Sequence, residues 1–328
     1  MKIYEYRIIV PCSVDQYKIG NIYMTAKRSE EESKQVKGEG IETVKNEPFQ
    51  NEKESGIYTY KIMHFKSRIP SFMRWALPDK YCHCHEKSWN AYPHYHTEYS
   101  VPGMGDDLIM DVDSFHVEYK KDEEIPDNLL NLSPEDLKIR KVVYLDILDG
   151  KPKPEKDRDL TNWKCPTLGV NEKFSHLRLD KKAKKDKEKK EKEQAKKDKK
   201  DKKDKKDSGP ESEPPEWTIN FQGQMMVAVK VVKIKFHWRG LQSIVEKYAT
   251  TNFYHNLFLD AHRAMMSWAD KWAPMSLDDV RAYEHQVYQQ NNALGFETDE
   301  NKPDVEPPAE KPEGVPDAPD TSEENENF

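Results

Sequence analysis

The stretch "GIETVKNEPFQNEKESGIYTYKIMHF", residues 40–65, contains two strand-like runs in succession. In each run, β-branched and aromatic residues alternate loosely with polar ones, a period of two that is typical of β-strands. Similar runs occur on both sides of it, at residues 2–10, 97–101, 107–119, 141–148 and 225–236. Strands that follow one another along the chain favour an antiparallel sheet.

Helical sequence is concentrated after the strands. The expected helices are a short one after the capping box of residues 13–16, a short one from residue 133, a long amphipathic one over residues 241–272 that Pro274 ends, and a last one over residues 276–292. Long helices that come late in the chain are expected to lie across the sheet. The order of elements therefore predicts an α+β protein rather than an alternating α/β one.

The bulk composition suits a soluble protein of one large domain or two smaller ones, with 328 residues, 35% hydrophobic residues and a formal net charge of -7. Charge is concentrated in two blocks. Residues 180–207 hold sixteen lysines against nine acids, and residues 297–328 hold twelve acids against two lysines. Such blocks are usually solvated. We therefore expect a domain over residues 1–292 with a Lys-rich disordered insertion at about 180–210, and an acidic, Pro-rich disordered tail over 293–328.

Several features indicate a cytoplasmic protein. No apolar run approaches the roughly 20 residues of a membrane-spanning helix, and the N-terminus does not read as a signal peptide. The four cysteines are few for the length, which favours a reducing compartment. The motifs GxGxxG, GxSxG and HExxH and a P-loop are absent, so common nucleotide and hydrolase chemistry has no anchor.

Residues 81–96, "YCHCHEKSWNAYPHYH", suggest a metal site. Cys82 and Cys84, like His94 and His96, are spaced i, i+2, which on a strand places both side chains on one face about 7 Å apart. Two such residues can bind one ion, but no second C-x2-C pair is present to complete a zinc site. The favoured interpretation is a strand near the surface, and the alternative is a metal-dependent enzyme built on these four residues.

Four polar residues point to a different kind of site. Thr59 and Lys61 share one face of a strand with apolar neighbours, and a lysine in such a place needs a partner or a path to water. The alternative is that Lys61 extends to solvent at the sheet edge. Glu86 and Asn90 would project from one side of a helical turn. A hydroxyl, an ammonium, a carboxylate and an amide together suit a polyhydroxyl head group that bears a phosphate.

Five segments closely resemble the class I phosphatidylinositol transfer proteins. They are "EYRIIVPCSVDQYKIGNIY" (5–23), "NEPF" (46–49), "YTYKIMHFKSRIP" (58–70), "HEKSWNAYP" (85–93) and "DAHRAMMSWADKWAPMSLDDVR" (260–281). The similarity covers most of the chain from Met1 to about Asn292, apart from the Lys-rich block. It implies a StART-like fold, in which a concave antiparallel sheet and long flanking helices enclose a cavity for one phospholipid.

The resemblance also implies roles for individual residues. In the family, the residues that match Thr59, Lys61, Glu86 and Asn90 bind the inositol head group, and an acidic residue that matches Glu284 is tied to the same lipid. Asn21, Thr97 and Ser114 fall where the family contacts the phosphate or choline end, although Asn21 and Ser114 replace the expected Gln and Thr. The cysteines and histidines around Glu86 then look incidental.

Residues 236–242, "FHWRGLQ", match the membrane-docking loop of the family. Trp238 is kept, whereas Arg239 stands in place of a second tryptophan. A tryptophan suits an interfacial anchor, and Arg239 would favour anionic lipid; the alternative for Trp238 is packing at a strand-helix corner. We interpret the Lys-rich block as a spacer with weak membrane attraction, and the alternative is an RNA-binding or nuclear-import patch.

The predicted function is that of a lipid carrier without enzymatic activity or cofactor. It would bind one phospholipid and exchange phosphatidylinositol for phosphatidylcholine between membranes, thereby supporting phosphoinositide supply. We expect a monomer that is cytoplasmic and peripheral on membranes, with no nucleic-acid partner. The alternatives are the Cys/His metal-dependent enzyme and a scaffold whose charged blocks bind partners.

Overall fold

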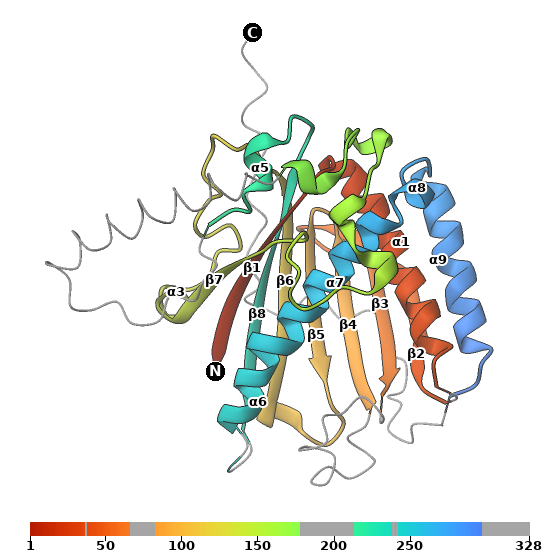
Figure 1. The fold of residues 1–328 in the computed structure, drawn as a ribbon. Coiled ribbons are helices and arrows are strands. Elements are labelled where there is room, and N and C mark those ends of the chain that lie inside the picture. The colour runs from red at the N-terminus through yellow and green to blue at the C-terminus, as the bar shows by residue number, and fades with distance from the viewer. Residues whose placement is uncertain (37, 66–82, 178–212, 238–239, 241, 297–328) are drawn as a thin grey trace, which may run out of the picture.

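An eight-stranded sheet forms the centre of the molecule, and helices lie across one of its faces (Figure 1). The computed structural model describes residues 1–36, 38–65, 83–177, 213–237, 240 and 242–296. The strands are β1 (Lys2–Val10), β2 (Gly40–Gln50), β3 (Ser55–His64), β4 (His83–Ala91), β5 (His94–Ser100), β6 (Leu108–Glu118), β7 (Arg140–Leu145) and β8 (Met226–Phe236). Their order across the sheet is β2-β3-β4-β5-β6-β8-β1-β7. The predicted α+β class is confirmed.

The sheet is mostly antiparallel, but it is mixed. Each neighbouring pair is antiparallel except β1 and β7, which are parallel. Parallel neighbours need a long crossover connection, and the chain supplies one, because β2 to β6 all lie between β1 and β7 in sequence. The predicted antiparallel sheet is thus confirmed, and the structure adds one parallel pair at the β7 edge.

The predicted helices begin where the sequence places them, but two of the predicted lengths are wrong and a short helix at Trp217–Asn220 was not expected. The helices of the structure are α1 (Val14–Ser33), α3 (Pro134–Ile139), α5 (Trp217–Asn220), α6 (Gln242–Tyr248), the π-helical segment η8 (Ala249–Phe253), α7 (Tyr254–Ser267), α8 (Ala269–Trp272) and α9 (Leu277–Asn292), with short 3-10 turns at Gly105–Asp107, Lys156–Arg158, Leu160–Asn162, Pro166–Leu168 and Phe174–Leu177. The predicted capping box of Ser13 and Gln16 is present. It begins a helix of 20 residues rather than a short one, because a cap fixes only the start of a helix.

The long helix predicted over residues 241–272 is divided into α6, η8, α7 and α8. Threonine hydroxyls compete for its backbone: Thr250 Oγ1 donates to the carbonyl of Glu246, and Thr251 Oγ1 to that of Lys247. The Tyr6 hydroxyl from β1 donates to the Thr250 carbonyl. Side chains that insert into the i→i−4 ladder are a recognised cause of irregular helix.

The helices pack on one another as well as on the sheet. A side chain at Gly20 of α1 would place its Cβ 2.9 Å from the ring of Trp272, so glycine allows α1 and α8 to approach closely. Trp272 is itself fully buried.

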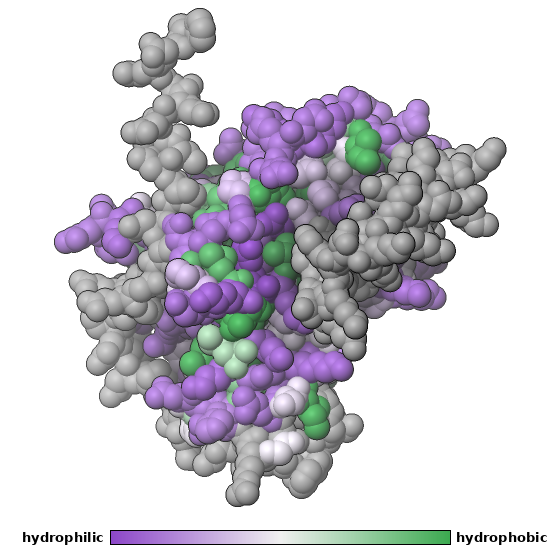
Figure 2. All heavy atoms as spheres, turned by 90° about the vertical axis from the view of Figure 1, so that its left-hand side faces the viewer, coloured by the Kyte–Doolittle hydropathy of each residue, from purple (hydrophilic) through white to green (hydrophobic). Residues whose placement is uncertain are grey.

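The side of the molecule shown in Figure 2 carries a narrow band of apolar side chains between hydrophilic ones.

Some predicted features lie outside the described residues. These are the Lys-rich insertion at about 180–210, the docking residues Trp238 and Arg239, Cys82, and the tail beyond residue 296. The proposed domain boundary at Asn292 coincides with the end of α9 and remains a prediction. Over the described ranges, we find no helix of the length and apolar character needed to cross a membrane.

Candidate functional site

Polar side chains form three neighbouring rows across the face of the sheet that the helices cover. The rows follow from strand register, and they are Lys61–Glu86–Tyr99, Thr59–Ser88–Thr97 and Asn90–Tyr95–Ser114–Lys230. Residues directly opposite on paired strands share a face, and successive rows along a strand lie about 7 Å apart. Strand pairing therefore gathers Thr59, Lys61, Glu86, Asn90, Thr97 and Ser114 into one polar area. A core face would normally be apolar there.

Lys61 lies at the centre of a group of opposite charges. It is 6% exposed, its Nζ lies 3.8 Å from Glu86 Oε1, and its ammonium lies 5.2 Å from the ring centroid of Tyr288. Burial alone would lower the pKa of Lys61, but Tyr288 and the Glu86 and Glu284 carboxylates outweigh burial, so the pKa is raised. The alternative in which Lys61 reaches solvent at a sheet edge is wrong, because β3 is an internal strand and the side chain is buried.

Glu86 and Asn90 lie on a strand, β4, and not on the helical turn that was considered for them. A spacing of four places both on one face of a strand as well, so the expectation that they share a side holds for a different reason. Asn90 donates to the Ile57 carbonyl at 3.1 Å and accepts from Ser88 Oγ at 3.1 Å. The Tyr99 hydroxyl is hydrogen-bonded to Glu86. These bonds orient the amide and the carboxylate.

Close contact between β3 and β4 depends on Gly56. A Cβ at this position would lie 2.1 Å from the Asn90 carbonyl oxygen, far inside contact distance. Any side chain here would push β4 away beside Asn90. In the row next to Asn90, the Ser88 and Thr97 hydroxyls are 2.8 Å apart, and Thr59 is 4% exposed.

Helix α9 places Glu284 above this area. Glu284 is 5% exposed, and both of its carboxylate oxygens have partners: Arg281 Nη1 donates to Oε2 at 2.6 Å, and the Tyr288 hydroxyl donates to Oε1 at 3.0 Å. The helix is fixed to the edge strand by Asn292, whose side chain bonds both the N–H and the carbonyl of Thr43. The structure thus brings Glu284 close to Lys61, and the role of Glu284 in lipid binding remains a prediction.

Asn21 and Ser114 belong to a second group beside the first. Asn21 of α1 is hydrogen-bonded to the Tyr95 hydroxyl, and Ser114 Oγ accepts from Lys230 Nζ at 3.2 Å. Burial lowers the pKa of Lys230 to about 8. In the row Asn90–Tyr95–Ser114–Lys230, Ser114 is two strand spacings from Asn90 and Lys230 is three. At about 4.8 Å per spacing, the two groups lie within about 15 Å of each other.

Five residues of this area were not singled out from the sequence: Lys230, Tyr95, Tyr288, Ser88 and Tyr99. Lys230 could have been found, because "VAVKVV" places it among apolar residues just as "YTYKIMHF" does for Lys61. Tyr288 gave no comparable signal, since its neighbours on both sides along the helix are ordinary for an amphipathic segment.

The metal-site alternative is not supported by the geometry of its described residues. Cys84 shares the helix-covered face with Glu86, whereas His94 and His96 lie on the opposite face. His96 Nδ1 instead pairs with Asp113 Oδ1 at 2.7 Å, and His94 Nδ1 lies 3.2 Å from Glu54 Oε2. Among the residues that the structure describes, no group of His, Cys, Asp and Glu side chains could hold a metal ion.

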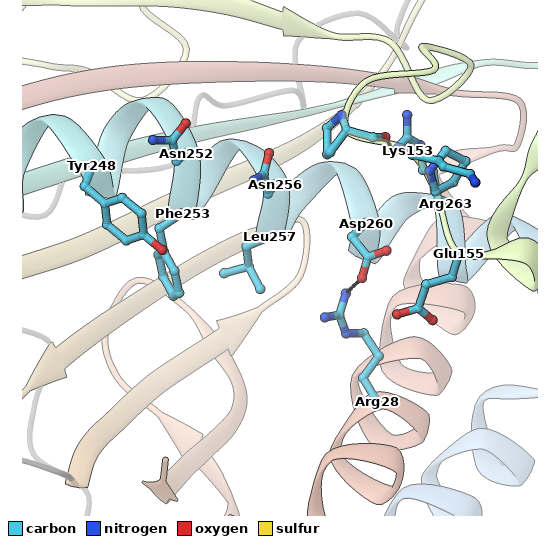
Figure 3. A pocket seen from close by; sticks show the side chains of 12 residues that line it. Arg28, Lys153, Glu155, Tyr248, Asn252, Phe253, Asn256, Leu257, Asp260 and Arg263 are labelled. Carbon is cyan, nitrogen blue, oxygen red and sulfur yellow. Dashed lines mark hydrogen bonds and ion pairs between the residues drawn. The ribbon is translucent and has the colours of Figure 1, made fainter. Parts of the chain in front are cut away.

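A pocket of about 370 Å³ lies elsewhere, on the outer side of α7 (Figure 3). A stripe on the helical segments lines one wall, made of Tyr248, Asn252, Asn256 and Asp260, and the loop around Lys153 and Glu155 lines the other. Arg28 and Asp260 pair across its end at 2.9 Å. The residues of the three rows are not among its lining, so this pocket is separate from the polar area.

Comparison with known proteins identifies what the chain is similar to. The family described as "Phosphatidylinositol transfer protein" matches residues 1–289. The chain is 32% identical over 303 residues to Phosphatidylinositol transfer protein 2 of Dictyostelium discoideum, covering 92% of this chain and 98% of that protein. It is also 32% identical over 285 residues to the rat (Rattus norvegicus) Phosphatidylinositol transfer protein beta isoform, covering 87% of this chain and 91% of that protein.

Proposed function

The chain belongs to the phosphatidylinositol transfer protein family, and we propose that it exchanges phosphatidylinositol for phosphatidylcholine between membranes, one molecule at a time. Members of this family are lipid transporters and not enzymes, so lipid transfer and phosphatidylinositol binding follow from membership. The exchange partner and the residues that select each lipid are the parts that we propose here.

The proposal depends chiefly on one observation: a buried lysine and two buried or half-buried carboxylates meet under α9, and the Asn90 amide lies on the same face of the sheet two rows away. Lys61 would donate to inositol hydroxyls or to phosphate, while Glu86 and Glu284 would accept from ring hydroxyls and Asn90 would do both. Thr59 adds a hydroxyl in the neighbouring row. An inositol ring presents hydroxyls all round its edge, and this mixture of donors and acceptors suits it.

A second group would serve the part that all phospholipids share. Lys230 carries a cation whose pKa is lowered by burial, so an anionic partner would stabilise its charged form. Ser114 lies within hydrogen-bond distance of it, and Asn21 and Thr97 add polar groups nearby. We assign the phosphate, and beyond it choline, to this side of the site.

No chemical step is needed for the carrier to work. Removing a two-chain lipid from a bilayer exposes its tails to water at a cost of about 0.8 kcal/mol per CH2 group. A protein interior that receives the tails removes this penalty. In the proposed cycle, a monomer from the cytoplasm docks through Trp238 and Arg239, exchanges its lipid and leaves the membrane, which would support phosphoinositide supply.

The selective residues can be tested in a vesicle assay with both lipids. Lys61→Ala and Asn90→Ala should lower phosphatidylinositol transfer roughly ten- to hundredfold, because each change removes a charged or paired polar contact. Phosphatidylcholine transfer should stay near that of the parent protein. Lys233→Ala is the matched control, since Lys233 pairs with Asp136 on the opposite face of the sheet. Equal loss of both lipids in the Lys61 and Asn90 variants would contradict the assignment.

A further inference from the structure

We propose that Tyr288 is a positioning residue that gives the site its preference for a polyhydroxyl head group, an inference that rests on the proposed function. Tyr288 lies on α9, is 4% exposed, and contacts both charged groups that face the head-group area from opposite walls. One is Lys61 on the sheet, and the other is Glu284 on the helix itself.

The contacts of Tyr288 join these two groups into a chain. Its hydroxyl donates to Glu284 Oε1 at 3.0 Å, and its ring centroid lies 5.2 Å from Lys61 Nζ. Residues 281, 284 and 288 share one side of α9 because of their i, i+3 and i+4 spacing. The order across the site is therefore Arg281, Glu284, Tyr288 and Lys61. In this order the groups are positive, negative, neutral and positive.

The phenol fixes a donor and an acceptor at the same time. The Tyr288 hydroxyl is hydrogen-bonded to the Lys61 ammonium, and the face of its ring attracts the same charge. Both contacts hold the Lys61 head group in place while its other N–H donors stay available. The hydroxyl takes one lone pair of Glu284, and Arg281 takes another, which leaves the remaining lone pairs of the carboxylate oriented and free to accept. A ligand with several hydroxyls can engage both groups together.

Choline offers no hydroxyl and no N–H, so it gains nothing from this arrangement. The contribution of Tyr288 should therefore appear in phosphatidylinositol transfer and not in phosphatidylcholine transfer. A residue that only filled space would behave otherwise: removing its hydroxyl while keeping the ring would change neither lipid. The neighbouring Val287, 1% exposed on the same helix, is such a packing residue and serves as a control.

The test compares Tyr288→Phe, Tyr288→Leu and Val287→Ala in transfer assays from vesicles that contain both lipids. Tyr288→Phe should lower phosphatidylinositol transfer roughly tenfold, with phosphatidylcholine transfer within about twofold of the parent. Tyr288→Leu, which also loses the ring face, should lower phosphatidylinositol transfer further. Val287→Ala should leave the ratio of the two lipids unchanged. An unchanged ratio in Tyr288→Phe, or an equal fall of both lipids, would overturn the inference.

A second measurement keeps the inference testable if one variant folds poorly. In a Lys61→Ala background, Tyr288→Phe should cause less than the tenfold loss that it causes alone, because the group that it positions is gone. Independent, multiplicative losses would overturn the inference. Failure of the proposed function looks different: the parent protein would then transfer neither lipid, whereas failure of the inference alone leaves parental transfer intact.

Discussion

The pKa of a buried lysine in this protein depends on whether a carboxylate lies beside it. Lys61 and Lys230 both lie under the helices, yet their pKa values move in opposite directions. Burial dominates for Lys230 and lowers its pKa to about 8, whereas Tyr288, Glu86 and Glu284 raise that of Lys61. A cation without a carboxylate beside it is a poor contributor to stability and a good place to bind an anion.

This contrast predicts the behaviour of Lys230→Met. Because the phosphate is common to all phospholipids, the variant should lose transfer of phosphatidylinositol and phosphatidylcholine together, by roughly tenfold or more. Its stability should be unchanged or higher, since a buried charge is removed. The measurements are transfer of each lipid and the urea midpoint of unfolding. Selective loss of phosphatidylinositol alone would contradict the assigned role.

The pair of His96 and Asp113 predicts a pH dependence of stability. Burial would lower the pKa of His96, but hydrogen bonds to Asp113 and Glu98 outweigh it and raise the pKa to about 9. The folded protein thus holds this proton more tightly than the unfolded chain, whose histidine pKa is about 6.5. The stabilisation is complete below pH 6.5 and is lost as the pH rises through 9, by about 3 kcal/mol in all.

His96→Gln removes this titration and keeps a polar side chain at the position. The stability difference between parent and variant should therefore be largest near pH 6 and shrink toward pH 9.5, as read from urea unfolding at a series of pH values. A difference that is constant over this range would show that His96 does not titrate as proposed.

Strands with an alternating pattern and helices with a clear N-cap could be predicted from the sequence. Elements without these signals could not. The Ser276 cap and the end of α9 are where the sequence places them. β4 was harder, because both of its faces are buried: Glu86 faces the helices, whereas Trp89 is 2% exposed in an apolar cluster on the other face. A strand with two buried faces has no alternation between core and solvent to read.

Long-range contacts escape sequence reasoning for a different reason. The α9–β2 contact through Asn292 and the α9–β3 contact through Tyr288 each join residues that are far apart in the chain. No local pattern encodes such a meeting. The resemblance to a known family supplied Glu284, but it could not supply Tyr288, which only the placement of α9 on the sheet reveals.

The two hydrogen bonds between Asn292 of α9 and Thr43 of the edge strand predict a loss of stability in Asn292→Ala. Its side chain satisfies both the N–H and the carbonyl of Thr43, at 2.9 and 2.7 Å, beside a register shift in β2. Losing these two part-buried hydrogen bonds should cost about 1–3 kcal/mol in total, although Asn292 is itself exposed. Urea unfolding gives the measurement, with Gln290→Ala on the exposed side of α9 as the matched control. Identical urea midpoints for the two variants would show that these two hydrogen bonds do not stabilise the fold.

At the scale of the whole molecule, the carrier proposal and the scaffold alternative make opposite predictions about the two charged blocks. The head-group area, the sheet and the covering helices all lie within the described residues, so the groups proposed to select the lipid are in place without residues 180–207 and 297–328. By count, these blocks carry net charges of about +7 and −10. Opposite blocks of this size act on charged surfaces over roughly a Debye length, about 8 Å at physiological salt.

A chain with residues 180–207 replaced by a short Gly-Ser linker and residues 297–328 removed should therefore transfer phosphatidylinositol between neutral vesicles within about twofold of the full chain. With anionic vesicles, removing the lysines should slow transfer at low salt, and the difference should fade at high salt because the attraction is screened. Cooperative unfolding in urea would show that the shortened chain is still folded. If this folded chain does not transfer lipid between neutral vesicles, the scaffold alternative is favoured, because a carrier needs only the cargo site and the means to cover it.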